Sequence, residues 1–191
     1  MRIMQARLRS KPGSKLYYGR PIEEDGDWME RAFIDSGDLL YLPAHAIKRC
    51  LDSSILFASK HSLLKGVDVD ALRHQFYTGI LISDAPRLTT ATGQHPLRRS
   101  DLLPVSHTVP RNGWGDSEKV TKIFPTVDSW ATCITMCLLL DDIDVSQAKS
   151  VVEWAGSYIG FGAMRLENGG CNGAFDLLEL VEASEPCQTT S

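Results

Sequence analysis

The order in which strand-like and helix-like patterns follow one another restricts the fold of this chain more than any other feature. Four segments alternate or run apolar as strands do, and two of the segments between them repeat apolar residues at helical spacing. In chain order the six segments are 1–11, 43–60, 79–83, 129–140, 147–155 and 174–182. This order is βαββαβ, which predicts an α+β fold with a ferredoxin-like or RRM-like core.

Capping residues mark the ends of the expected helices. Pro43 suits the first turn of the first helix, where its missing N–H costs nothing. An additional short helix over 68–77 follows an acidic cap at Asp68 or Asp70. Ser146 is the expected cap of the last helix, and Gly156 is its expected left-handed stop.

Residues 84–128 interrupt this order and contain five prolines with little periodicity. We therefore expect one RRM-like domain over 1–191 with a long thumb-like insertion at 84–128, and a frayed tail over 183–191. The insertion is either a variable surface excursion or a basic extension that grips a partner. Its candidate contact residues are Arg98, Arg99 and Arg111.

Charge is distributed unevenly along the chain. The net charge is −4, yet the first twenty residues carry six basic groups and no acid, whereas residues 126–191 carry two basic and ten acidic groups. This balance argues against a histone-like protein that binds nucleic acid by overall charge alone. It leaves room for a local basic track, since phosphates are contacted by one face of a protein; a merely solvated surface is the alternative.

The first strand predicts such a track. Its even-numbered residues, Met4, Ala6 and Leu8, face a core if the segment is half buried. The opposite row then consists of Gln5, Arg7, Arg9 and Lys11. We expect this row to contact phosphates.

A glycine-rich stretch separates the last helix from the last strand, with six of the fifteen glycines between Gly156 and Gly173. A dinucleotide-binding fingerprint is excluded because the stretch follows a helix and precedes a strand, and because Arg165 stands at the third glycine position. Two interpretations remain: a bulge and turn that lead into the strand, or backbone amides that hold phosphates beside Arg165. The candidate amide positions are Gly160, Gly162 and Gly170.

Catalytic and metal-binding signatures are absent from the sequence. The five cysteines include no CxxC pair, and the histidines form no HExxH motif. An acidic run at 23–27 is either solvated or able to supply a general base or hold a metal. We expect no cofactor and no metal, and no secretory signal or membrane span is recognisable, so we expect a cytoplasmic protein.

Two segments, "LYLPAHAIKRCLDS" and "AGSYIGFGAMRLENGGCNGAFDLLEL", resemble the first-helix signature and the C-terminal glycine loop of the RAMP superfamily, the backbone and related subunits of CRISPR effector complexes. They occur in the order that the family requires. The resemblance implies an RRM-like core with an inserted thumb, guide RNA bound along a basic groove, and identical subunits stacked head to tail. Departures at His45, Ala46, Arg49 and Phe161 leave open a stand-alone or phage-encoded relative.

The resemblance also assigns residues. Lys48 and Arg49 match the basic positions of the first-helix motif, and some members of the family cut RNA with an aspartate placed like Asp27, which has Asp25 as a neighbour. We favour a non-catalytic protein that binds single-stranded RNA, or single-stranded DNA, as a homo-oligomer or as a subunit of a ribonucleoprotein. The alternatives are a ribonuclease that uses Asp27 or Asp25, and an interaction module or inhibitor that mimics a CRISPR subunit.

Overall fold

The computed structural model describes residues 1–18, 22–23, 27–61, 68–110, 117–141 and 143–183. The helices are α1 (Ala44–Lys60), α2 (Val69–Gly79) and α3 (Val145–Trp154), and short helical turns occur at Trp28–Arg31, Arg99–Asp101, Ala155–Ile159 and Leu166–Asn168. The strands are β1 (Arg2–Ser10), β2 (Leu16–Tyr17), β3 (Ile22–Glu23), β4 (Ile80–Ile82), β5 (Leu103–Pro110), β6 (Lys119–Val127), β7 (Ala131–Leu138) and β8 (Phe175–Ala183). No described helix is both long enough and apolar enough to cross a membrane.

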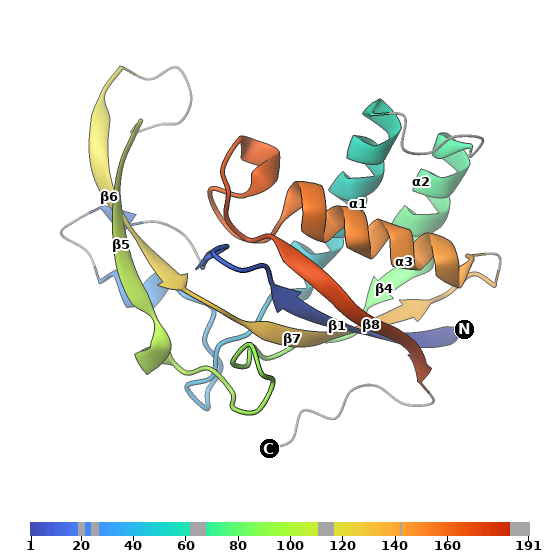
Figure 1. Cartoon of the computed structure of the whole chain (residues 1–191), viewed down its shortest axis with the longest axis horizontal. Coiled ribbons are helices and arrows are strands. Elements are labelled where there is room, and N and C mark those ends of the chain that lie inside the picture. The colour runs from blue at the N-terminus through green and yellow to red at the C-terminus, as the bar shows by residue number, and fades with distance from the viewer. Residues whose placement is uncertain (19–21, 24–26, 62–67, 111–116, 142, 184–191) are drawn as a thin grey trace.

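Four of these strands form an antiparallel main sheet in the order β4-β7-β1-β8. The two strands that are central in this order, β1 and β7, are the first and third of the βαββαβ series, as a ferredoxin-like core requires. The three helices lie on one face of the sheet (Figure 1). The predicted α+β fold class is therefore confirmed, and we call the side of the main sheet that faces away from the helices the free face.

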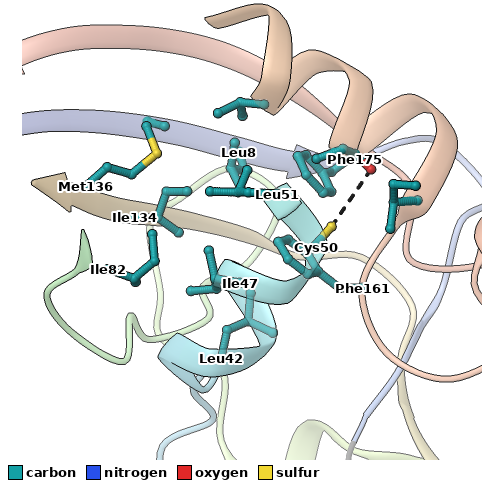
Figure 2. Packing of buried hydrophobic residues seen from close by; sticks show 14 of the residues in the cluster. Leu8, Leu42, Ile47, Cys50, Leu51, Ile82, Ile134, Met136, Phe161 and Phe175 are labelled. Carbon is teal, nitrogen blue, oxygen red and sulfur yellow. Dashed lines mark hydrogen bonds between the residues drawn. The ribbon is translucent and has the colours of Figure 1, made fainter. Parts of the chain in front are cut away.

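Alternation along β1 separates the core from the free face. Met4, Ala6 and Leu8 are buried beneath the helices, as their even spacing predicts. Figure 2 shows that α1 contributes Ile47, Cys50 and Leu51 to the same cluster. Their spacing of three and four residues places them on one side of α1. Burying such a face, rather than helix propensity alone, is what stabilises a helix of this length.

A second sheet contains β5, β6, β2 and β3, with β6 paired to each of the other three. We call β5 and β6 the hairpin. They run antiparallel from the pair Leu103 and Thr126 to the pair Pro110 and Lys119, and in Figure 1 they extend away from the helices. Regular strand structure within 84–128 differs from the irregular insertion expected there. The prolines of β5 are tolerated because β5 is an edge strand.

Two helix ends differ from the predicted ones. Asp144, not Ser146, caps α3, because its carboxylate accepts the Ser146 N–H at 2.9 Å. The helix also does not stop at Gly156 but continues as a single π-helical turn to Ile159, and Gly160 then reverses the chain with φ = +77°. Asp68 caps α2, as one of the two expected residues.

Candidate nucleic-acid interface

The part of the predicted basic row that belongs to β1 lies on the free face of the main sheet. Gln5, Arg7 and Arg9 alternate with the buried residues of β1. Lys11 follows directly after the strand, where its amine lies 3.2 Å from Ser157 Oγ and 3.7 Å from Asp176 Oδ1. Arg7 and Arg9 are therefore exposed on the free face, whereas the Lys11 amine reaches the helical turn that continues α3.

An acidic row on β8 runs beside this basic row. Arg7 is opposite Glu179 in the register, and their charged groups are 3.7 Å apart. The side chains are 70% and 49% exposed, respectively. Exposed ion pairs of this kind contribute only about 0 to 1 kcal/mol. A phosphate can therefore take the place of the carboxylate on Arg7 at little cost.

A groove of about 350 Å³ opens on the free face next to Arg7. It is lined by Leu178 of β8, by Cys133 of β7, which lies on the other side of β1, and by residues of the turn at 89–93. None of these groove residues was among the residues predicted to bind nucleic acid. The sequence does contain a pattern that points to an irregularity at Leu178: two adjacent leucines, Leu177 and Leu178, break the alternation of the last strand.

Lys48 and Arg49 lie on α1, on the opposite side of the sheet from the basic row. The Lys48 amine binds the carboxylate of Asp52, donates to the carbonyl oxygen of Phe76 at 3.1 Å, and lies 5.3 Å from the centre of the Tyr77 ring. Its side chain is only 23% exposed. These contacts join α1 to α2, whereas Arg49 is exposed on the helix surface. The structure does not bring either residue together with Arg7.

The arginines of the insertion are dispersed. The backbone N–H of Arg98 donates to Asp101 Oδ2 at 2.7 Å, and its side chain is exposed. Arg99 forms an ion pair with Asp38 at 3.2 Å. Arg111 lies outside the described residues.

Hydrogen bonds within the chain occupy several amides of the glycine-rich stretch. Gly160 N donates to the carbonyl oxygen of Ala155 at 2.8 Å, and Gly170 N donates to that of Arg165 at 3.1 Å. The guanidinium of Arg165 binds Glu167 at 2.6 Å and is only 19% exposed. Of the two interpretations of the stretch, this geometry favours the turn that leads into β8.

Gly162 allows this stretch to approach a neighbouring strand. A Cβ added at Gly162 would lie 2.3 Å from the carbonyl oxygen of Tyr17. The next residue, Ala163, donates its N–H to the same oxygen at 3.1 Å. The stretch therefore connects the end of α3 to β2 of the second sheet.

The aromatic residues near the hairpin are packed inward. Tyr17 Oη lies 2.8 Å from His107 Nε2, and both rings contact Phe124. Burial raises the pKa of the Tyr17 hydroxyl. Tyr18 is buried, and its hydroxyl donates to the carbonyl oxygen of Phe33 at 2.6 Å. Neither tyrosine presents a ring face on which a base could stack.

The carboxylate assigned to catalysis by the family resemblance has a structural contact. Asp27 Oδ1 accepts the N–H of Met29 at 3.0 Å and so caps the helical turn that begins at Trp28. Asp25 lies outside the described residues. Within the parts of the chain that the structure describes, no group of three or more His, Cys, Asp or Glu side chains is placed to hold a metal ion.

Comparisons with known proteins include a match to a solved structure. No family model matches the sequence, and no curated protein matches it. A solved structure that the chain resembles is described as "Cryo-EM structure of the Type III-B Cmr-beta bound to cognate target RNA", with a TM-score of 0.55 and 16% sequence identity. The match covers 95% of this chain and 60% of the neighbour, so the chain spans less than two thirds of that neighbour's length. The likeness shows the fold, and it agrees at that level with the resemblance to subunits of CRISPR effector complexes.

Proposed function

We propose that this chain is a non-catalytic, CRISPR-associated RNA-binding protein that holds single-stranded RNA on the free face of its main sheet. The observation that carries the proposal is the pair Arg7 and Arg9, both exposed on the free face, with Lys11 just beyond the end of the strand beside Asp176 of β8. In an RRM-like fold this is the face on which RNA lies. The fold neighbour comes from a complex bound to target RNA, which favours RNA over DNA.

The acidic total charge of the chain does not oppose this proposal. Phosphate contacts act over about 8 to 10 Å at physiological ionic strength, so the local row matters more than distant charges. The carboxylates of β8 are close enough to matter, and they compete with phosphate for the same cations. We therefore expect moderate, salt-sensitive affinity.

Salt dependence of binding tests the proposal directly. Three cations on a single strand predict a log–log slope of about −2, or about 20-fold weaker binding between about 50 and 200 mM NaCl. The measurement is fluorescence anisotropy of a labelled RNA of about 30 nucleotides, a usable length for several phosphate contacts. Absence of binding at the lower salt concentration, or an affinity that does not change with salt concentration, would contradict the proposal.

Two further arms of the same experiment separate the alternatives. A DNA strand of the same sequence is expected to bind more weakly because it lacks the 2′-hydroxyl. Equal affinity for the two strands would mean that the protein binds single-stranded nucleic acid in general and does not select RNA. The bound RNA is expected to remain intact for hours with and without Mg²⁺. Cleavage that the variant Asp27→Asn abolishes would favour the ribonuclease instead.

We also propose that copies of the chain associate head to tail through the two edges of the main sheet. At the β4 edge, Tyr77 and Leu81 are 70% and 53% exposed, and Leu139 lines the same hollow of about 340 Å³. Exposed large apolar side chains next to an unpaired strand edge favour a protein partner. A second copy fits this edge because the opposite edge, β8, presents the exposed Val181 between acidic residues, whereas His45 and Lys48 line the hollow at β4.

The mass of the protein in solution tests this association. Leu81→Glu places a charge on the exposed edge and is expected to weaken association about tenfold, since burying an unpaired charge opposes docking. Light scattering coupled to size-exclusion chromatography over a range of concentrations provides the measurement. Leu103→Glu is the matched control, because Leu103 is comparably exposed but lies on the hairpin. A wild-type chain that is monomeric at every concentration would contradict the proposal.

A further inference from the structure

The groove on the free face has two walls built in different ways. One wall is Leu178, which lies where the register between β1 and β8 shifts at Arg7 and Leu8. The shift leaves Leu178 without a partner in β1, and its side chain is exposed. The other wall is the turn containing Ala91 and Thr92. An exposed leucine facing a turn across an open groove provides an apolar surface that the chain itself does not cover.

The turn that forms the second wall is firmly attached to the sheet. Thr89 and Ala131 exchange two backbone hydrogen bonds, each 2.9 Å long. Within the turn, Thr90 N donates to the carbonyl oxygen of His95 at 2.8 Å, and Gly93 N donates to that of Thr90 at 2.7 Å. These bonds fix the width of the groove, so the groove is preformed and does not need to be opened by a ligand.

The chemistry of the lining matches a nucleobase. A base has two apolar faces and a polar edge, and the groove combines the apolar Leu178 and Ala91 with the hydroxyls of Thr89 and Thr92. Thr89 Oγ1 donates to the carbonyl oxygen of Ala131 at 3.2 Å, which leaves its lone pairs able to accept a bond from an exocyclic amine. Arg7 stands at the groove with its exposed guanidinium, placed for the phosphate next to that base.

In the part of the chain that the structure describes, the two central strands carry no aromatic side chain on the free face that could stack on a base. RRM-like sheets usually stack bases on aromatic side chains of their two central strands. Among the described residues, β1 and β7 place Gln5, Arg7, Cys133 and Thr135 at the corresponding positions on that side of the sheet; none of them is aromatic, and Thr135 is buried. Base recognition on this face therefore depends on the groove.

We propose that the groove binds one unstacked base of the RNA strand, with the adjoining phosphate on Arg7. This inference rests on the proposed function, because the strand must lie on the free face for its base to enter. The groove volume of about 350 Å³ is at the lower end of the range of small-ligand pockets and is large enough for one base. The strand would otherwise be held by charge alone, so the groove adds a contact that the backbone cannot supply.

An abasic strand separates the base contact from the phosphate contacts. We compare an RNA of about ten nucleotides with an abasic strand of the same length and charge, and expect the wild-type protein to bind the base-bearing strand about tenfold more tightly. The variant Ala91→Trp fills the groove and is expected to remove this preference while leaving affinity for the abasic strand and its salt dependence unchanged. Gln94→Trp, on the exposed part of the same turn, is the matched control and is expected to retain the preference.

Each result has a distinct meaning. Equal binding of the two strands by the wild-type protein, with salt dependence intact, overturns the base pocket but not the proposed function. Binding of neither strand at low salt overturns the proposed function. A preference that persists in Ala91→Trp also overturns the pocket, and Leu178→Ser provides a second check because it removes the opposite wall at an exposed position; it too is expected to lose the preference.

Discussion

Gly162→Ala is expected to lower the free energy of unfolding by about 3 kcal/mol, combining backbone strain with steric overlap. Gly162 has φ = +78°, a conformation that costs an alanine energy wherever it occurs. The added Cβ would in addition lie 2.3 Å from the carbonyl oxygen of Tyr17, which is backbone and cannot move aside as a side chain can. The second cost is therefore specific to the contact between the glycine-rich stretch and β2.

Another glycine of the same stretch allows the cost of backbone strain to be measured without steric overlap. Gly169 has φ = +76°, yet a Cβ added there would meet nothing within 4 Å. Gly169→Ala is therefore expected to cost about 1 kcal/mol, from backbone strain alone. Urea denaturation measures both variants, and a shift of the midpoint at constant slope identifies a change in stability. Equal losses for the two variants would show that the close approach to Tyr17 contributes nothing.

The main sheet could be predicted from the sequence because its signals are local. The alternation of Met4, Ala6 and Leu8 and the helical spacing in α1 are both visible within a few residues. The hairpin could not be predicted in this way. One of its strands, β6, pairs with β2 and β3, about a hundred residues earlier in the chain, and the prolines of the hairpin interrupt the local strand pattern. Tertiary pairing, not propensity, determines structure there.

Part of the candidate site could also be predicted from the sequence, because some of its signals are local. The face on which Arg7 lies follows from alternation along β1, but its partner Glu179 depends on a register between strands far apart in sequence. The internal contact of Lys48 did have a local signal, since Asp52 follows it by four residues, the spacing of a helical ion pair. No local signal indicates that amides of the glycine-rich stretch are hydrogen-bonded within the chain, because their acceptors are fixed only when the turn folds.

The double variant Arg7→Glu and Arg9→Glu is expected to weaken RNA binding by about 100-fold at low salt, since each reversal removes a phosphate contact and adds a repulsion. Both side chains are exposed, so the fold should be retained. The matched control is Lys60→Glu with Lys149→Glu, which changes the net charge equally at exposed positions of α1 and α3, on the other side of the main sheet. Fluorescence anisotropy compares the two proteins with the wild type. Equal losses in both double variants would mean that total charge, and not the free face, attracts the strand.

Removing the competing acid should have the opposite effect. Glu179 holds the Arg7 guanidinium at 3.7 Å and repels an incoming phosphate, so Glu179→Gln frees the cation and removes the repulsion together. We expect about threefold tighter binding, because an exposed pair is worth less than about 1 kcal/mol. In a protein that already carries Arg7→Glu, the substitution Glu179→Gln should give only the part of the gain in affinity that comes from removing the repulsion. A full threefold gain there would mean that Glu179 acts independently of Arg7, and that the strand does not replace the carboxylate on this arginine.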